Sequence, residues 1–167
     1  MGRDKARLRL GGRTMLFLVR AVAAGTSHRV RVIRRDAVPR CGPLGGILTG
    51  LRSAKAEAVL FLACDMPLVT VALLRKVIRA SGDNFRAVFS SQSGRVGFPL
   101  LLPAKALEAV QAQITAGHFS LQRLATVLRA RELRVGSRQL CNVNTPEDVR
   151  LATRLLARTK KPTVGCD

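Results

Sequence analysis

The segment Val59–Pro67 constrains the fold of this chain most, because it is an apolar run that ends at a single carboxylate. It reads Val-Leu-Phe-Leu-Ala-Cys-Asp-Met-Pro. A short apolar run of this length is typical of a strand that is buried on both faces of a parallel sheet. We therefore expect a central strand over Ala58–Ala63 that brings Asp65 to the carboxyl edge of the sheet, where ligands bind in open α/β proteins.

Length and composition indicate one domain with a sizeable core. The chain has 167 residues, of which 47% are hydrophobic and only 4% aromatic, so aliphatic side chains must form most of the core. We expect a single domain over residues 1–159 and a flexible tail over 160–167. No run of 18 apolar residues occurs, so no membrane span is expected.

The four cysteines lack the spacing of a metal site or of a disulfide framework. Cys64 is expected to be a small residue of the core, because it follows the apolar run. The absence of a disulfide pattern is typical of a reducing compartment, so the sequence predicts a cytoplasmic protein.

The net charge of +19 favours anionic partners such as nucleotides, nucleic acids or lipid surfaces. The arginines are scattered along the chain, so solvated faces and a true anion-binding surface both remain open interpretations. Nucleic-acid binding is disfavoured, because the six Phe residues are dispersed and no stacking aromatics accompany the basic residues.

Strands alternate with helices of moderate length, which favours a parallel α/β sheet with short right-handed crossovers. The predicted helices are Thr14–Ala24, Leu44–Ser53, Thr70–Arg79, Ala104–Thr115, Ser120–Arg129 and Pro146–Ala157, and the predicted strands are Arg29–Arg34, Ala58–Ala63, Phe85–Ser90, Phe98–Leu102 and Glu132–Val135. The hairpin-like pair Phe85–Leu102 and the late strand near Val135 are expected to form a mixed edge. Residues 1–12 are expected to form a polar loop.

Asp65 is the first candidate functional residue. Burial of a carboxylate is costly unless the group is paired or binds a metal ion. One carboxylate is enough for Mg²⁺, which usually keeps waters and phosphate oxygens as its other ligands. The alternative is that Asp65 caps the turn around Met66 and Pro67.

Three further features are weaker signals when each is taken alone. Lys5 comes just after a loop that contains Gly2 and could contact phosphate, or it could be an exposed lysine near the terminus. The small residues of Gly42–Gly46 precede a helix, whose first N–H groups can bind an anion or a base edge, but an ordinary tight turn is an equal reading. Asp36 could accept hydrogen bonds from a base or ribose, or bond to its own backbone.

The segment Asn142–Asp148 is a junction between a loop and a helix. Thr145 fits the N-cap position, with Pro146 at the first helical position and acidic residues in the first turn. These roles do not explain Asn142 and Asn144. Alternate side chains of an extended segment point the same way, so both amides could face one ligand.

Four motifs span nearly the whole chain. They are Met1-Gly2-Arg3-Asp4-Lys5-Ala6, Gly42-Pro43-Leu44-Gly45-Gly46-Ile47, Ala63-Cys64-Asp65-Met66-Pro67 and Asn142-Val143-Asn144-Thr145-Pro146-Glu147-Asp148. In this order the chain resembles the molybdenum cofactor guanylyltransferase family, within the wider nucleotidyltransferase group of the same fold. The last motif is more similar to the guanylyl branch than to the cytidylyl branch, where Asp is expected at the asparagine positions.

The resemblance implies a three-layer Rossmann-like nucleotidyltransferase fold with a mostly parallel sheet. It implies an enzyme that moves GMP from GTP to the terminal phosphate of molybdopterin and releases pyrophosphate. Lys5 and Asp65 would be the catalytic residues, with Asp65 as the Mg²⁺ ligand and Asn142 and Asn144 on the molybdopterin side. The implied GTP contacts are Lys5, Asp36, Gly42, Pro43, Leu44, Gly45 and Asp65. Acceptor molybdoenzymes or their chaperones are implied as further partners.

The chain departs from the family pattern in two places. The family begins with a strand and a Leu-Ala-Gly-Gly-x-Ser-x-Arg loop, whereas this chain starts inside that motif at Met1. The stretch Gly25–Asp36 is also short for the strands that the family has there. We therefore expect the first strand and the Gly-rich loop to be missing. Cytidylyl transfer to molybdopterin, a truncated non-catalytic remnant and a basic nucleic-acid-binding module stay open as alternatives.

Overall fold

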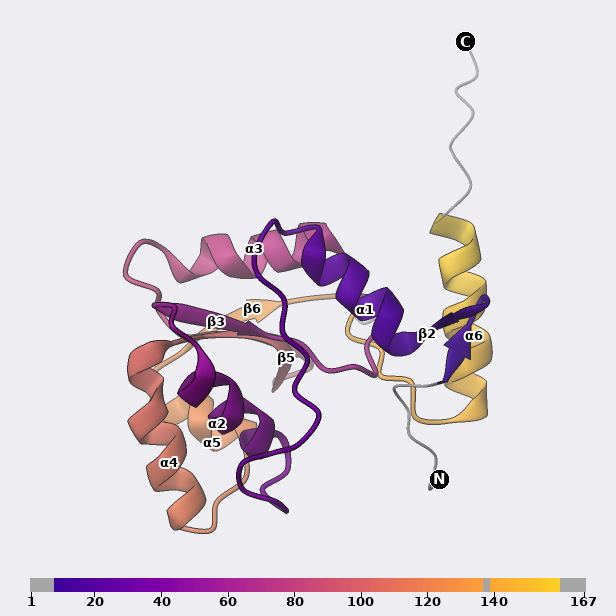
Figure 1. Cartoon of the computed structure of the whole chain (residues 1–167). Helices are drawn as coiled ribbons and strands as arrows, with labels where there is room; N and C mark the ends of the chain where they lie inside the picture. Colours follow the sequence, from indigo (N-terminus) through magenta and orange to yellow (C-terminus); the bar gives the residue numbers. More distant parts are fainter. Residues whose placement is uncertain (1–7, 137–138, 160–167) are drawn as a thin grey trace.

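Helices lie on both faces of a four-stranded sheet, so the molecule has three layers (Figure 1). The structure is a computed structural model that describes residues 8–136 and 139–159. Lys5 and the predicted tail therefore lie outside the described residues. Among the helices of the described part, none has both the length and the apolar character needed to cross a membrane.

The sheet has the strand order β3-β5-β4-β6. Its strands are β3 (Ala58–Phe61), β4 (Val88–Gln92), β5 (Arg95–Pro103) and β6 (Arg131–Arg134). β5 pairs antiparallel with both β3 and β4, and β6 pairs parallel with β4. Three of the four strands therefore point the same way, and the predicted α/β class is confirmed.

Two layers of helices cover the sheet because its strands alternate apolar side chains between the two faces. Helices α2 (Pro43–Ser53), α4 (Leu107–Thr115) and α5 (Leu121–Val127) lie on one face, and α1 (Met15–Ala24) and α3 (Val71–Ser81) lie toward the other (Figure 1). In β5, Leu100 and Leu102 belong to the core cluster on the α2 side, whereas Leu101 packs with Leu73 and Val77 of α3. A short 3-10 turn, η2 (Ala104–Ala106), precedes α4.

Side-chain oxygens begin three of the helices, as capping chemistry predicts. The hydroxyl of Thr14 accepts a hydrogen bond from the N–H of Phe17, and Thr70 accepts one from Leu73, both at 3.2 Å. Ser120 caps α5 in the same way. The predicted starts at Thr14, Thr70 and Ser120 are confirmed, and Gly25 ends α1 as expected.

A small unit lies beside the three layers and joins the two ends of the described chain. It contains β1 (Arg9–Leu10), β2 (Arg13–Thr14) and α6 (Pro146–Thr159) (Figure 1). β1 and β2 form a short hairpin through Gly11 and Gly12, which both adopt positive φ, so the predicted loop over residues 1–12 is wrong at its end. Leu10 and Met15 pack with Val143 and Ala152 in one buried cluster.

The strand predicted over Arg29–Arg34 is wrong. This segment has no regular secondary structure, and it joins neither sheet. Val32 and Ile33 are adjacent and both half-buried, whereas a strand buries every second residue. The charged residues around them stay exposed, so apolar burial supplies little reason for this segment to join the sheet.

Three expectations around β3 also need correction. β3 ends at Phe61, forms an edge of the described sheet and pairs antiparallel, so it is not the central parallel strand that was predicted. The antiparallel strand β5 lies inside the sheet and not at a mixed edge, because it pairs with β3 as well as with β4. Cys64 is exposed and does not belong to the core, because it lies in a turn beyond the end of the strand.

Candidate functional site

Asp65 lies in a turn just beyond the carboxyl end of β3. The turn is fixed by the residues that follow it: Met66 and Val69 are 3% and 4% exposed and pack with the fully buried Leu74 of α3. The sequence correctly predicted that the apolar strand brings this carboxylate to the carboxyl edge of the sheet. The buried side chains of Met66 and Val69 therefore hold the turn in place, and Asp65 itself is half-buried.

One oxygen of the Asp65 carboxylate is buried and has no hydrogen-bond partner among the described residues. If Asp65 were a cap, its carboxylate would accept a hydrogen bond from a backbone N–H of the turn, and no such bond occurs among the described residues. Most buried polar atoms in folded proteins have a partner, so an exception calls for a ligand, an ion or water. The carboxylate oxygen is therefore suited to a hard cation such as Mg²⁺.

The segment that carries the two asparagines runs beside the Asp65 turn. The N–H of Val143 donates to the carbonyl oxygen of Asp65 at 2.8 Å. Val143 is 2% exposed, whereas Asn142 and Asn144 on either side of it are exposed. The alternation confirms an extended segment whose two amide side chains lie on the face opposite to Val143. The structure thus places the segment that carries Asn142 and Asn144 next to the Asp65 turn.

The start of α2 lies at the same edge of the sheet as Asp65. Only residues 54–57 join α2 to β3, so the two elements run in opposite directions and the first turn of α2 lies near the end of β3 (Figure 1). Gly42 takes a positive φ of 53° as N-cap, and Pro43 opens the helix. The side chain of Leu44 is fully buried in the core, so only its backbone could contact a ligand.

Asp36 lies against the first turns of α2. A Cβ atom on Gly45 would lie 2.7 Å from its Oδ2, and one on Gly46 would lie 3.5 Å from its Oδ1. The loop is tied to the helix by Thr49, whose hydroxyl accepts a hydrogen bond from the N–H of Ala37 at 2.8 Å and donates to the carbonyl of Gly45 at 2.7 Å. The carboxylate of Asp36 is exposed and makes no hydrogen bond to its own backbone in the described structure.

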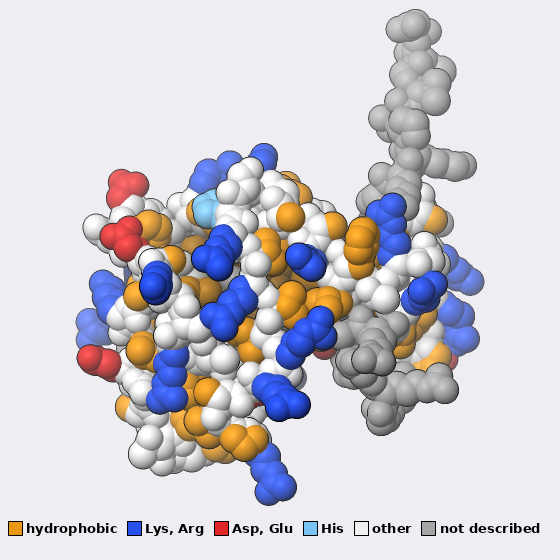
Figure 2. Space-filling model, in the orientation of Figure 1, with side chains coloured by type: hydrophobic (Ala, Val, Ile, Leu, Met, Phe, Trp, Pro, Cys, Tyr) orange, Lys and Arg blue, Asp and Glu red, His pale blue; other side chains and the backbone are white. Residues whose placement is uncertain are grey.

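The long connection between α1 and α2 adds positive charge to the front of the molecule. Exposed arginines at positions 29, 31, 34, 35 and 40 lie on this connection, which crosses the sheet in the view of Figure 1, and basic side chains are spread over the same face in Figure 2. Such a face attracts anionic ligands. Lys5, the predicted phosphate contact, lies outside the described residues.

Cys141 lies in the loop beside the Asp65 turn, and its surroundings disfavour the thiolate form. Burial, and after it the carboxylate of Asp148, raise the pKa of the Cys141 thiol above its ordinary value of 9.0, so the thiol is protonated at neutral pH. Across the described ranges, no three His, Cys, Asp or Glu side chains gather into a metal centre. A metal ion here would depend on Asp65 together with oxygens of its substrate.

Sequence reasoning missed the structural role of Val143. Its buried side chain fixes the loop, and its N–H couples the asparagines to the Asp65 turn. The only available signal was an apolar residue between two polar ones. Tertiary pairing between two loops has no local pattern from which the partner could be read.

Comparison with known proteins shows to which family the chain belongs. Residues 1–135 match the MobA-like NTP transferase domain. The chain belongs to this family. The match covers all four strands of the β3-β5-β4-β6 sheet and includes Asp36, the start of α2 and the Asp65 turn.

Two relatives illustrate how much of a MobA-like protein the chain represents. It is 31% identical over 173 aligned positions to the "Probable molybdenum cofactor guanylyltransferase" of Opitutus terrae, covering 89% of this chain and 86% of that protein. It is 35% identical over 111 residues to the molybdenum cofactor guanylyltransferase of Pseudomonas entomophila, covering 64% of this chain and 58% of that protein. The chain therefore spans a little more than half the length of the Pseudomonas relative.

Solved structures show the same fold. The molybdopterin-guanine dinucleotide biosynthesis protein A of Archaeoglobus fulgidus aligns over 94% of this chain and 92% of its own, with a TM-score of 0.69 and 15% identity. The 2-C-methyl-D-erythritol 4-phosphate cytidylyltransferase of Thermus thermophilus aligns over 92% and 94%, with a TM-score of 0.73 and 18% identity. Both likenesses concern the fold, and they place the chain among nucleotidyltransferase-like α/β proteins.

Proposed function

We propose that this MobA-like protein transfers GMP from GTP to the terminal phosphate of molybdopterin. The observation that carries the proposal is the buried, unpartnered oxygen of Asp65 beside the asparagine segment. Family membership and the two guanylyltransferase relatives support the reaction class. The asparagines, where the cytidylyl branch is expected to have Asp, favour guanylyl over cytidylyl transfer.

In this proposal the Asp65 carboxylate binds Mg²⁺. The orphaned oxygen fits such an ion, since carboxylate oxygens are preferred ligands and Mg²⁺ takes its remaining ligands from phosphates and water. When bound, the ion supplies charge neutralisation at the phosphates of GTP. The backbone hydrogen bond from Val143 and the buried Met66 hold the turn, so the carboxylate is already oriented before the substrate arrives.

The reaction needs positioning and charge neutralisation more than covalent chemistry by the protein. An oxygen of the molybdopterin phosphate attacks the α-phosphorus of GTP and forms a new P–O bond. The bond from that phosphorus to the bridging oxygen breaks, and pyrophosphate leaves with the electron pair. We assign Lys5 to the phosphates, where its ammonium group would stabilise the charge that develops on the leaving group.

The start of α2 and Asp36 are assigned to the nucleotide. Gly42, Pro43, Leu44 and Gly45 would contribute backbone groups, because the side chain of Leu44 is in the core and Gly42 is exposed at the N-cap of the helix. The exposed carboxylate of Asp36 would accept hydrogen bonds from the base or the ribose. Asn142 and Asn144 would face molybdopterin, and the acceptor molybdoenzymes or their chaperones would receive the product.

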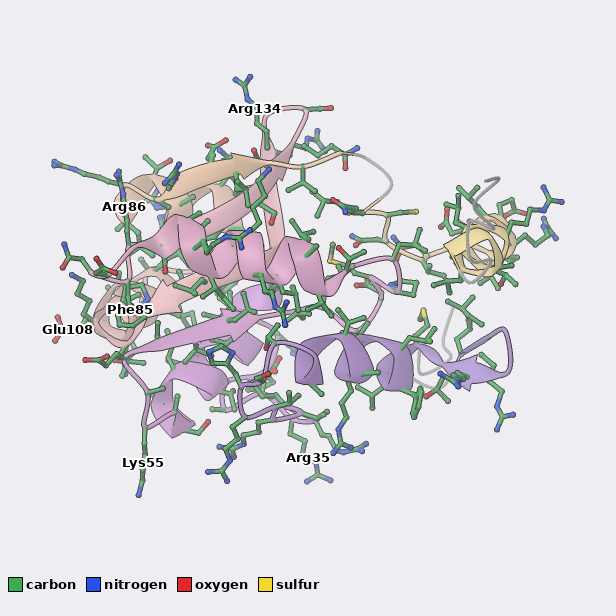
Figure 3. The ribbon with its side chains drawn as sticks, turned by 90° about the horizontal axis from the view of Figure 1, so that it is seen from above. Arg35, Lys55, Phe85, Arg86, Glu108 and Arg134 are labelled. Atoms are coloured by element: carbon green, nitrogen blue, oxygen red, sulfur yellow. The ribbon has the colours of Figure 1, made fainter. Side chains whose placement is uncertain are left out.

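Turnover tests the proposal directly. The chain is incubated with radiolabelled GTP, molybdenum-loaded molybdopterin and Mg²⁺, and the labelled dinucleotide is measured. We expect product with wild type, and at least about a hundredfold less with Asp65→Ala, since loss of one electrostatic contact in the transition state costs about 2.7–4 kcal/mol. Glu108→Gln is the matched control, because it also removes one negative charge but from an exposed position on α4 (Figure 3).

Three outcomes overturn this assignment. Equal turnover by Asp65→Ala and wild type would remove Asp65 from the mechanism. A product formed from CTP in preference to GTP would reassign the chain to cytidylyl transfer. Absence of turnover with either nucleotide would identify the chain as a non-catalytic member of the MobA-like family.

A further inference from the structure

A pocket lies at the edge of the sheet opposite to Asp65. Its volume is about 700 Å³, within the range of about 300–1,000 Å³ typical of small-molecule sites. It lies between the end of α3, the residues that enter β4 and β6, the end of β5 and the turn η2. β3, β4 and β6 point away from it, so this pocket and the Asp65 turn are at opposite ends of the same strands.

The pocket is positively charged. Four cationic side chains line it, from Arg79, Arg86, Lys105 and Arg131, against a single carboxylate, Asp83. The one ion pair between described residues joins Arg150 to Glu147 on α6, so none of the four cations is neutralised by a carboxylate within 4.0 Å. Like charges that face a shared cavity repel one another and attract an anion.

Two of these cations are held in place by hydrogen bonds to the backbone. Arg86 donates from Nη2 to the carbonyl oxygen of Arg129 at 3.0 Å, and Arg131 donates from Nη1 to the carbonyl oxygen of Ala80 at 3.4 Å. The side chains of Arg79 and Lys105 are exposed and make no hydrogen bond with another described residue. Figure 3 shows Arg86 at the end of the molecule away from α6. The pocket thus combines two arginines held by the backbone, Arg86 and Arg131, with two cations, Arg79 and Lys105, whose N–H donors are available to a ligand.

Apolar groups complete the lining. Val127 is 56% exposed although it is a large aliphatic residue, and Leu128, Ala106 and Pro103 also line the pocket. A bare inorganic anion would leave this surface uncovered. A ligand that bears a phosphate beside an apolar or planar body would use both the cations and Val127.

We propose that this pocket binds a phosphorylated small molecule, with its phosphate at Arg79, Arg86, Lys105 and Arg131 and its apolar body against Val127. The site is independent of the proposed nucleotidyl transfer, because it shares no residue with the edge that carries Asp65. An experiment that disproves ligand binding in this pocket would therefore leave the proposed nucleotidyl transfer untouched, and the reverse also holds.

Pyridoxal 5′-phosphate is a suitable probe, since it carries a phosphate, an aromatic ring and an aldehyde. The aldehyde condenses with a lysine amine to form an imine and water, and borohydride then reduces the imine to a stable secondary amine. The full chain has only six lysines, so peptide mass spectrometry can follow each of them. We expect Lys105 to be labelled before Lys55 and Lys76, which are also exposed but do not line the pocket; Figure 3 shows Lys55 pointing away from the molecule.

Substitution of Arg79 distinguishes specific phosphate binding in this pocket from nonspecific attraction of an anion to a basic protein. Arg79→Gln should lower labelling of Lys105 about tenfold, the loss expected from one charge-assisted hydrogen bond, and leave labelling of Lys55 and Lys76 unchanged. Arg52→Gln, an exposed arginine on α2, is the matched control and should change nothing. Equal labelling of the three lysines, or equal effects of the two arginine substitutions, would overturn the proposal. So would a loss of Lys105 labelling upon addition of an acidic peptide but not upon addition of inorganic phosphate.

Discussion

At the scale of single residues, the contact between Asp36 and α2 depends on the absence of one side chain. A Cβ on Gly45 would lie 2.7 Å from Asp36 Oδ2 and 2.9 Å from the carbonyl oxygen of Val38. Real Cβ atoms do not approach other atoms this closely, and the carbonyl belongs to the backbone, which cannot swing away as a side chain can. Gly45 is therefore required for the loop that carries Asp36 to lie on the helix.

Gly45→Ala should destabilise the protein, although alanine is the better helix former. We expect a loss of about 1–3 kcal/mol in the free energy of unfolding, the usual cost of overpacking. Gly46→Ala is the control from the same turn: its Cβ would lie 3.5 Å from Asp36 Oδ1, an ordinary contact, so it should stabilise by about 0.5–1 kcal/mol. Urea unfolding measures both. A neutral or stabilising Gly45→Ala would show that the loop does not lie on α2.

The predictability of the candidate site varied from residue to residue for physical reasons. Asp65 could be found because a carboxylate directly after an apolar run is costly to bury without a partner. Asn142 and Asn144 could be singled out as candidates because Thr145 and Pro146 already explained the helix start and left the two asparagines without a role. The burial of Leu44 and the approach of Asp36 to Gly45 depend on contacts across the fold, which no local pattern records.

At the scale of elements, α6 begins with a reciprocal cap. The Thr145 hydroxyl accepts a hydrogen bond from the N–H of Asp148 at 3.1 Å, while the Asp148 carboxylate accepts from the N–H groups of Asn144 and Thr145 at 2.9 and 2.8 Å. The bond from Asn144, followed by those from Thr145, lowers the pKa of Asp148 below its ordinary value of 3.8. The cap also shapes the segment that carries both asparagines.

The cap should therefore weaken in acid. Because the folded pKa of Asp148 is the lower one, its stabilising effect is complete above about pH 4–5 and is lost as the pH falls through the folded pKa. Proton NMR should show the amide resonances of Asn144 and Thr145 titrating with a midpoint below 3.8. Asp148→Asn should abolish this titration, and Glu147→Gln, in the same turn, should preserve it. A midpoint at or above the ordinary value would contradict the cap.

Helices were easier to predict than strands in this chain. Thr14, Thr70 and Ser120 predict helix starts because their hydroxyls can accept local hydrogen bonds, and the structure confirms each start. The segment Arg29–Arg34 has the residue types of a strand, yet strand formation needs a partner that local sequence does not identify. The interior position of β5 could not be predicted for the same reason, since its pairing with β3 joins residues about forty positions apart in the sequence.

At the scale of the whole molecule, the charge is poorly balanced. The net charge is +19, and the described residues form one ion pair, between Arg150 and Glu147. Two like charges about 4 Å apart in water repel by about 1 kcal/mol, and salt screens this repulsion. Much of the positive charge must therefore oppose folding at low ionic strength, unless an anion is bound.

Salt should accordingly stabilise the protein. Raising NaCl from about 0.02 M to about 0.3 M shortens the screening length severalfold, and the free energy of unfolding should rise by on the order of 1 kcal/mol. Urea unfolding at fixed pH measures the change. A decrease in stability with salt would show that attractive pairs outweigh repulsion in this chain.

The central claim is that Asp65 holds a divalent cation against a nucleoside triphosphate. Isothermal titration of GTP into the full chain, with Mg²⁺ and with EDTA, tests it for wild type and for Asp65→Asn. We predict that Mg²⁺ strengthens GTP binding to wild type about tenfold or more, the effect of a charge-assisted contact worth about 1.5–3 kcal/mol, and that this gain disappears in Asp65→Asn. The same Mg²⁺ effect in both proteins would contradict the claim.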